Sequence, residues 1–287
     1  MRRPRGRVRL DRELVRRGLV ASRQAAQEVI AAGLVTVDGA PGRKPATQVS
    51  THQQIVVTGP ARRWVSRGGD KLDGALDRFD LAVTGRECLD VGASTGGFTD
   101  VLLARGAARV VAVDVGYGQL AWRLRTDERV VVVERTHVRD LTVDHLAGSQ
   151  PDLVVADLSF ISLRTALPPL RTLLGAGVDW CCLAKPQFEV GRDHVGRGGV
   201  VQDPDAWGRA LDAVRDAAAN LDLTVAGATV SDLPGPAGNI EFFVWLRDRS
   251  RSGDRAPGTG DGDPVDWAPL RDALLAQGTA LRARTNG

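Results

Sequence analysis

The chain has 287 residues, of which 43% are hydrophobic and 25% charged, as is ordinary for a globular protein with room for one large domain and one small one. Its three cysteines are too few for a disulfide framework and suit a reducing cytoplasm. There is no apolar run of about 18 residues, no secretory leader and no metal-ligand spacing among the four histidines, so we expect no membrane span, no export and no metal.

The charge is distributed unevenly along the chain. Residues 1–67 contain 14 Arg or Lys against 4 Asp or Glu, a net charge of +10, while the remainder carries −7. A basic module on an acidic body is typical of an enzyme with a polyanion-docking domain, and an arginine-rich solvated face is the alternative. Only Lys44, Lys71 and Lys185 are lysine among 38 basic residues, which favours sites that need a compact or deprotonatable ammonium.

The first 60 residues predict a small α+β module behind a basic arm. Residues 1–9 contain five arginines and are expected to be flexible. Apolar spacing predicts a helix from Leu10 that Gly18 ends, and a second helix that Ser22 caps and Gly33 closes. Short strands are expected at residues 34–37 and 54–57, with Asp38-Gly39 as a hairpin turn.

This module resembles the S4 RNA-binding domain over about residues 7 to 60. The resemblance rests on R-L-D-x-x-L-V-x-R-G-L-x-x-S-R-x-x-A followed by G-L-V-x-V-D-G. It implies a helix pair that presents basic side chains to structured RNA. The residues that we expect at the RNA are Arg5, Arg7, Arg16, Arg17, Arg23, Lys44, Arg63 and Arg67.

A glycine-rich stretch from Cys88 to Asp100, C-L-D-V-G-A-S-T-G-G-F-T-D, is the strongest motif. An apolar run stops at an acid and breaks into glycines, which predicts strand, tight turn and helix, with positive φ at Gly92, Gly96 and Gly97. Ser94 stands where a dinucleotide fingerprint needs its middle glycine, so the pattern instead resembles the first motif of S-adenosylmethionine-dependent methyltransferases.

A second acid supports a nucleotide-like cofactor. The run R-V-V-A-V ends at Asp114, about 20 residues after the glycine turn, where a carboxylate suits a ribose diol. A structural turn with a solvated Asp114 is the alternative. The residues that we expect to bind S-adenosylmethionine are Asp90, Gly92, Ser94, Gly96, Gly97, Phe98, Asp114 and Asp140.

Further apolar runs alternate with helical patterns downstream. They predict strands at residues 130–133, 152–156, 179–184 and 223–230, with helices at 163–174 and 204–220, and hence a parallel sheet covered on both faces. A last strand at residues 240–246 follows a short Pro-Gly loop, so we expect it to be antiparallel.

Four domain segments follow from this reading. They are an S4-like module at residues 1–60, a linker at 61–66, an α/β Rossmann-like methyltransferase domain at 67–248 and a largely disordered tail at 249–287. Within the tail, a short amphipathic helix is expected from Trp267 to Arg282.

Four polar residues terminate separate elements of the expected domain: Lys71, Asp157, Lys185 and Glu241. The carboxyl ends of parallel strands converge on one edge of a sheet, so Asp157 and Lys185 should lie near the cofactor turn. Two lysines and two carboxylates in one crevice change one another's proton affinity, which suits removal of a hydroxyl proton. Isolated surface ions are the alternative.

The motifs together resemble the TlyA family, also labelled hemolysin A, over about residues 7 to 247. They are R-R-W-V-S-R-G-G-D-K-L, D-V-G-A-S-T-G-G-F-T-D, A-V-D-V-G-Y-G-Q-L, A-D-L-S-F-I-S-L, K-P-Q-F-E and G-N-I-E-F-F-V. The resemblance implies 2′-O-methylation of ribosomal RNA, with cytidine as the nucleotide, and places the family's Lys-Asp-Lys-Glu tetrad on these four residues. His137 departs from the asparagine expected in E-R-T-N.

The expected protein is therefore a cytoplasmic, monomeric methyltransferase that uses S-adenosylmethionine on ribosomal RNA in ribosomal subunits. Three alternatives remain open at this stage. A cytolysin would need a membrane-active segment, a non-catalytic ribosome-binding factor would not need the tetrad, and a nicotinamide-dependent reductase would need a different glycine spacing.

Overall fold

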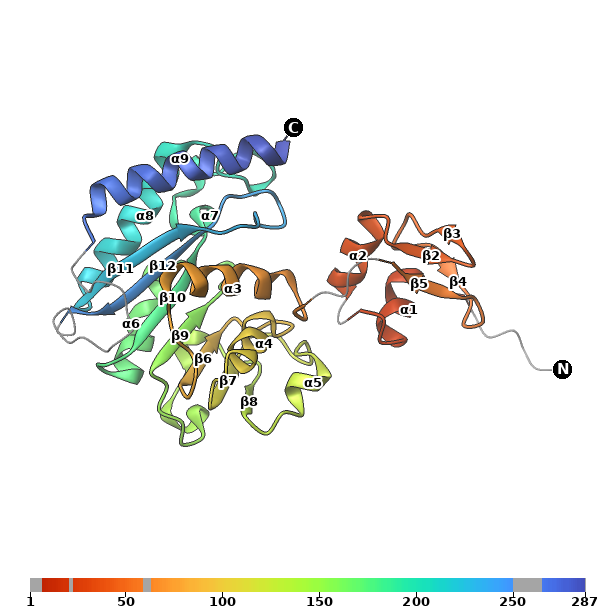
Figure 1. The fold of residues 1–287 in the computed structure, drawn as a ribbon, viewed down its shortest axis with the longest axis horizontal. Helices are drawn as coiled ribbons and strands as arrows, with labels where there is room; N and C mark the ends of the chain where they lie inside the picture. The colour runs from red at the N-terminus through yellow and green to blue at the C-terminus, as the bar shows by residue number, and fades with distance from the viewer. Residues whose placement is uncertain (1–6, 21–22, 59–62, 250–264, 287) are drawn as a thin grey trace. The chain divides into compact units, whose positions relative to one another are not determined.

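The computed structural model describes residues 7–20, 23–58, 63–249 and 265–286. It divides into two compact units, Met1–Ser66 and Arg67–Gly287, which are described separately (Figure 1). Several expectations concern residues outside the described ones: the contact of Arg5, the cap at Ser22, the first two linker residues and the disorder of residues 250–263.

In the first unit, α1 (Leu10–Arg16) and α2 (Arg23–Ala31) pack with short strands. The order β3 (Ala40–Pro41), β2 (Val35–Val37), β5 (Ile55–Val57) forms one sheet, and β1 (Val8–Arg9) pairs with β4 (Gln48–Val49). Val37 pairs with Ala40, and the intervening Asp38 and Gly39 have φ of 49° and 81°, so the expected two-residue hairpin turn is confirmed.

A seven-stranded sheet forms the centre of the second unit (Figure 1), in the order β11-β12-β10-β9-β6-β7-β8. All strands are parallel except β12, which is antiparallel to both of its neighbours. This arrangement confirms the expected α/β fold with an antiparallel last strand. The strand bounds are β6 (Glu87–Val91), β7 (Arg109–Val113), β8 (Val130–Val133), β9 (Leu153–Ala156), β10 (Asp179–Ala184), β11 (Leu223–Val230) and β12 (Phe242–Asp248).

Helices cover both faces of this sheet, because its strands are apolar on both sides. Successive residues of β12 show the two layers: Phe242 packs against Trp207 of α8 (Pro204–Ala219), and Phe243 against Phe98 of α4 (Gly97–Ala104). The helices α3 (Arg67–Phe79) and α6 (Leu163–Leu174) contact α4 and α8, respectively. Shorter elements complete the connections: α5 (Trp122–Arg125), α7 (Pro186–Glu189), η1 (Val138–Asp140), η2 (Val143–Leu146), η3 (Arg192–His194) and η4 (Arg197–Gly199).

The last helix, α9 (Trp267–Asn286), lies alongside α8 (Figure 1). The Trp267 indole donates a 2.6 Å hydrogen bond to Asp212 of α8, and Leu274 is buried. A Cβ at Gly278 would lie 3.1 Å from the Trp207 ring, so the glycine permits close packing. The helix ends at Asn286 rather than at the expected Arg282, and its apolar residues, including Leu270 and Leu275, pack against the core. None of the described helices combines the length and apolar character that a membrane crossing requires.

Candidate functional site

Polar residues gather at the carboxyl edge of the parallel strands. Asp114 follows β7, Asp157 follows β9 and Lys185 follows β10. Because β12 runs the opposite way, its beginning lies at the same edge: Ala184 pairs with Phe242, so Lys185 and Glu241 occupy the next positions of adjacent strands. Glu241 thus precedes the strand, which begins at Phe242 rather than at the expected residue 240.

The glycine turn after β6 lies against the start of the loop that follows β9, the strand that pairs with β6. Gly92 has φ of 89°, and a Cβ there would lie 2.5 Å from the carbonyl oxygen of Asp157, so a side chain is excluded at this position. Positive φ also occurs at Ser94 (49°) and Gly96 (97°). Gly97 is instead the first residue of α4, which corrects the expectation of positive φ there.

Asp90 lies in β6, two residues before this turn, and is fully buried. Thr99 of α4 donates a 2.6 Å hydrogen bond to its Oδ2, while Oδ1 has no hydrogen-bond partner among the described groups. Burial raises the pKa of Asp90 to about 7, despite the opposing hydrogen bond from Thr99. A cationic ligand group placed near Oδ1 would therefore be stabilised.

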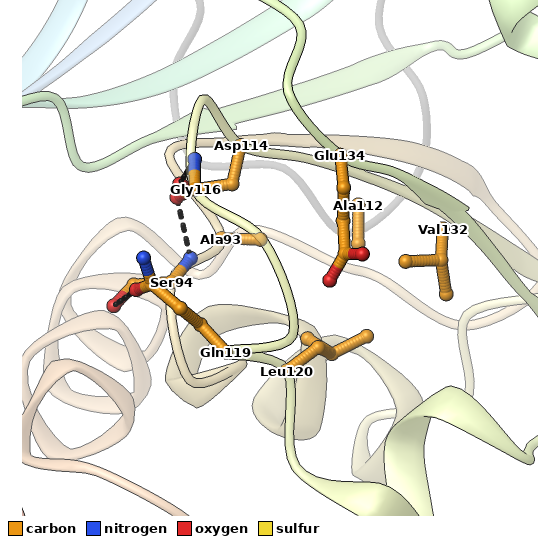
Figure 2. Close-up of a pocket in the computed structure, with 9 residues that line it drawn as sticks. All are labelled: Ala93, Ser94, Ala112, Asp114, Gly116, Gln119, Leu120, Val132 and Glu134. Atoms are coloured by element: carbon orange, nitrogen blue, oxygen red, sulfur yellow. Dashed lines mark hydrogen bonds between the residues drawn. The ribbon is translucent and has the colours of Figure 1, made fainter. Parts of the chain in front are cut away.

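Beside the turn lies a pocket that is partly open to solvent (Figure 2). Asp114 joins its two walls, since Oδ2 accepts from the Ser94 amide at 2.8 Å and Oδ1 from the Gly116 amide at 2.6 Å. Glu134, which follows β8, brings a second carboxylate that accepts from the Gly118 amide at 2.8 Å and pairs with Arg125. The remaining lining residues are Ala93, Ala112, Gln119, Leu120 and Val132.

Of the eight expected cofactor residues, Ser94 and Asp114 line this pocket, and Phe98 and Asp140 are among the six that do not. The Phe98 ring is buried against Phe243, with ring centroids 6.0 Å apart, because it belongs to the apolar face of α4. Asp140 is exposed at the end of η1, after the chain has left β8. Glu134 and Gln119 were not among the expected cofactor residues. Glu134 follows an apolar strand directly, as Asp114 does, so the same signal could have identified it.

The four expected tetrad residues form two ion pairs. Lys185 Nζ lies 2.6 Å from Asp157 Oδ1 and donates to Ser159 Oγ at 3.3 Å. Lys71 Nζ, from α3, lies 2.5 Å from Glu241 Oε2, and both side chains are buried, 7% and 1% exposed. The loop before Glu241 encloses this second pair, since a Cβ at Gly235 would lie 2.5 Å from Glu241 Oε1.

An exposed aromatic residue lies in the loop that follows Asp157. Phe160 is 92% exposed and has φ of 66°, a left-handed conformation that is strained for a bulky residue. Its ring contacts that of Phe188, with centroids 5.5 Å apart. The sequence signal was an aromatic residue three positions after a strand-terminating acid, and Phe160 was not among the expected site residues.

In the first unit, two carboxylates lie beneath the basic surface of α1. Asp11 pairs with Arg9 and Arg23, and Glu13 with Arg16 and Arg17. Hydrogen bonds from Arg9 hold the pKa of Asp11 well below its usual range, and those from Arg16 lower the pKa of Glu13 to about 2.

These pairs leave the expected RNA-binding residues unequally exposed. The Arg16 and Arg23 side chains are 58% and 53% exposed, whereas that of Arg17 is 21% exposed. Arg17 also donates to the Gln53 carbonyl at 2.7 Å, so it stabilises the module and is withdrawn from the surface. Arg17 is thus less available than Arg16 and Arg23, and its expected RNA contact stays a prediction.

The other expected basic residues differ in their surroundings. Arg7 and Lys44 are exposed, and Arg63 lies 4.6 Å from the ring centre of Trp64. Arg67 belongs to α3 of the second unit and donates to the Pro234 carbonyl at 3.2 Å. Within the described ranges, no group of three or more His, Cys, Asp or Glu could hold a metal ion.

Comparisons with known proteins agree with this geometry. Residues 64–248 match the model of the FtsJ-like methyltransferases, and residues 8–55 match the S4 domain. The chain is 57% identical over 256 residues to the 16S/23S rRNA (cytidine-2′-O)-methyltransferase TlyA of Mycobacterium tuberculosis, covering 89% of this chain and 95% of that one. It is 37% identical over 237 residues to Hemolysin A of Brachyspira hyodysenteriae, covering 83% and 98%.

A solved structure from Streptococcus thermophilus that carries the name hemolysin is also similar. It shares 34% sequence identity with this chain and has a TM-score of 0.75. The match covers 98% of each of the two chains. The family matches imply a cofactor of the S-adenosylmethionine type, and the S4 domain implies an RNA substrate. The chain belongs to the FtsJ-like methyltransferase family and, within it, to the S4-containing proteins named TlyA or hemolysin A.

Proposed function

We propose that the protein transfers a methyl group from S-adenosylmethionine to the ribose 2′-hydroxyl of a cytidine in ribosomal RNA. The observation that carries this proposal is the pair of adjacent ion pairs, Asp157–Lys185 and Lys71–Glu241, at the sheet edge beside the glycine turn. The name of the Mycobacterium tuberculosis relative supports the reaction and the nucleotide. Since ribosomes are the substrate, we place the reaction in the cytoplasm.

The turn and the pocket fit the proposed cofactor. Gly92 leaves room for close approach, and the unpartnered Asp90 Oδ1 suits the ammonium of the methionine part. Asp114 and Glu134 suit the hydroxyls and amine of the adenosine part, since each carboxylate oxygen can accept more than one hydrogen bond. These residues, with the backbone of Ser94 and Gly96, would hold the cofactor.

When bound, the cofactor supplies a methyl carbon that a sulfonium already activates. Lys185 would act as general base in its unprotonated form and accept the 2′-hydroxyl proton as the methyl group passes from the sulfonium, which becomes a neutral thioether, to the ribose oxygen. Asp157 and Ser159 fix the direction of its Nζ, at 2.6 and 3.3 Å. The Lys71–Glu241 pair anchors α3 to the start of β12, next to Lys185. Most of the acceleration would come from orientation of the two reactants.

The first unit supplies RNA affinity in this proposal. Exposed Arg7, Arg16, Arg23 and Lys44 are suited to phosphate contacts, which position RNA without specifying its sequence. The Phe160 ring, exposed beside Lys185, is suited to stack on an unpaired base. Strain at this residue is consistent with a functional constraint.

Methyl transfer to ribosomal subunits tests the proposal directly. Purified protein is incubated with tritiated S-adenosylmethionine and with unmodified 30S or 50S subunits, and the label is located in the RNA after nuclease digestion. We expect label on a 2′-oxygen of cytidine. Binding to subunits without transfer would instead favour a non-catalytic ribosome-binding factor, and label on a base would exclude the reaction proposed here.

A further inference from the structure

Lys185 is held by an element that is too short to fix it alone. It is the residue before α7, which spans only Pro186–Glu189. One helical turn has little stability of its own, because nucleation fixes several residues for one hydrogen bond. Strand β10 holds Lys185 on its N-terminal side, and on the other side its position depends on what secures the far end of α7.

Glu189 at the end of α7 makes that connection. Its side chain is 1% exposed, and its Oε1 accepts a 2.6 Å hydrogen bond from the amide of Leu163, the first residue of α6. Arg164 adds a 2.7 Å hydrogen bond to the Glu189 carbonyl, and its Nε lies 3.5 Å from Glu189 Oε2. The end of α7 is thus joined to the start of α6.

The start of α6 is, in turn, the end of the loop that carries Asp157 and Ser159. Two segments therefore run side by side and are tied at both ends, by Lys185–Asp157 at one end and by Glu189–Leu163 at the other. The Phe160–Phe188 ring contact lies between the two ties in sequence, with centroids 5.5 Å apart.

A role as an ordinary helix cap is only part of what Glu189 does. Ser162 is already the N-cap of α6, and its hydroxyl accepts from the Thr165 amide at 3.3 Å. Burial raises the pKa of Glu189 to about 7, which shows that the site is unfavourable for a carboxylate. Glu189 takes a different donor of α6, the Leu163 amide, and because it belongs to α7 the same hydrogen bond also links the two helices.

We propose that Glu189 is a positioning residue for methyl transfer, because it holds the segment of Lys185 against the segment of Asp157. The inference rests on the proposed function and names a further residue on which that function depends. Glu189 does not reach the substrate and acts only through Lys185 and Asp157. Its effect should therefore appear in the rate of transfer and not in the binding of cofactor or RNA.

Three substitutions at position 189 separate the contribution of side-chain length from that of side-chain charge. Glu189→Gln keeps an oxygen at the same reach without the charge, Glu189→Asp keeps the charge but is one methylene shorter, and Glu189→Ala removes both. Asp203→Ala is the matched control, since Asp203 caps α8 through a 3.0 Å hydrogen bond from the Asp205 amide and has no contact with α7 among its hydrogen bonds and ion pairs in the described residues.

For each variant the single-turnover rate of transfer, the affinities for S-adenosylmethionine and for ribosomal subunits, and the melting temperature are measured. We expect Glu189→Gln to transfer within about threefold of wild type and Glu189→Asp to lose about 10-fold to 100-fold, as a misplacement of about 1 Å does. Glu189→Ala should match Glu189→Asp. Both affinities should stay within about twofold, and Asp203→Ala should melt earlier yet transfer at the wild-type rate.

Several results would overturn the proposal. They are a Glu189→Asp protein that transfers at the wild-type rate, a Glu189→Gln protein as slow as Glu189→Asp, or rate losses that match losses of cofactor affinity. If Glu189→Ala fails to fold, the Gln and Asp variants decide alone. If the wild-type protein transfers no methyl group, the proposed function itself is wrong, and the proposal for Glu189 falls with it. If the wild-type protein is active, the variants test the proposal for Glu189 alone.

Discussion

At the scale of single residues, the choice of lysine over arginine is informative. Arginine provides 35 of the 38 basic residues, yet both cations of the buried edge of the sheet are lysines. Lys185 Nζ fits between Asp157 and Ser159, at 2.6 and 3.3 Å, where a planar guanidinium would have to displace one of them. The site therefore selects a compact amine, which can also exist without its proton.

We expect Lys185→Arg to lower the rate of methyl transfer by about 100-fold to 10,000-fold, the usual contribution of general-base catalysis. Arginine keeps the positive charge but does not lose its proton in proteins. Affinities for S-adenosylmethionine and RNA should remain close to wild type. Single-turnover methylation with parallel binding measurements checks this expectation. Near-normal transfer would show that Lys185 acts only as a charge, and Lys71 would become the next candidate for the base.

At the scale of elements, the sequence predicted those parts that depend on local pattern. The strands β8, β10 and β11 begin and end at the expected residues, because buried strands are continuous apolar runs bounded by polar residues. The hairpin turn at Asp38-Gly39 was predictable because the Asp-Gly pair accepts the positive φ angles that a two-residue hairpin needs. The same pattern identified Asp114, Asp157 and Lys185, the polar residues that follow β7, β9 and β10.

Features that depend on distant partners were not predictable in this way. The two-residue strands β1 and β4 exist only because they pair with each other across 40 residues of chain. The sequence alone indicates that Arg17 is a free surface cation. In the structure it donates hydrogen bonds to Glu13 and to the Gln53 carbonyl, and the second of these partners is distant in sequence. Phe98 follows the glycine turn like a cofactor residue, but tertiary packing against Phe243 decides its position.

The turn between β6 and α4 gives a prediction for cofactor binding. We expect Asp114→Ala to lower the affinity for S-adenosylmethionine by about 1 to 3 kcal/mol, because the change removes the acceptor that joins the Ser94 and Gly116 amides. Calorimetric titration measures the loss, with Asp203→Ala as a control remote from the pocket. Unchanged affinity would remove Asp114 from the binding site.

Helix α1 gives a prediction for pH dependence. The pKa of Glu13 falls from 4.5 to about 2 on folding, so its contribution to stability is present above about pH 4.5 and is lost as the pH falls toward 2. Asp11, whose pKa is also lowered, acts in the same direction. In the full chain, the melting temperature of the first unit, followed through the α1 amide resonances, should fall over this range. Glu13→Gln should flatten the slope, and an identical slope would refute the assignment.

At the scale of the whole molecule, charge is divided between the two parts of the sequence. Residues 1–67 carry +10 and the rest −7, so affinity for a polyanion should be concentrated in the first unit. The opposite sign of the second part opposes nonspecific binding of RNA to the methyltransferase domain. The first unit would thus attract RNA, and the second unit would carry out the methyl transfer.

We expect removal of residues 1–66 to abolish methylation of ribosomal subunits while leaving the affinity for S-adenosylmethionine within about twofold. The boundary follows the division of the chain after Ser66. For the full chain, RNA affinity should fall steeply with salt, because each phosphate contact releases counterions. Filter binding at several salt concentrations measures the slope. If the truncated protein methylates subunits at the full rate, the positive charge of the basic module has no role in RNA binding and is only a solvated surface.

The place of β12 in the sheet has a consequence for biosynthesis. Lys71 and its partner Glu241 are 170 residues apart, and β12, the last strand in the sequence, is inserted between β10 and β11. At about 5 to 20 residues per second, a ribosome adds Glu241 roughly 10 to 35 s after Lys71. During that interval the nascent sheet lacks an inner strand and Lys71 lacks its counter-ion. The basic module, made first, can therefore fold and meet RNA well before the chain becomes able to react.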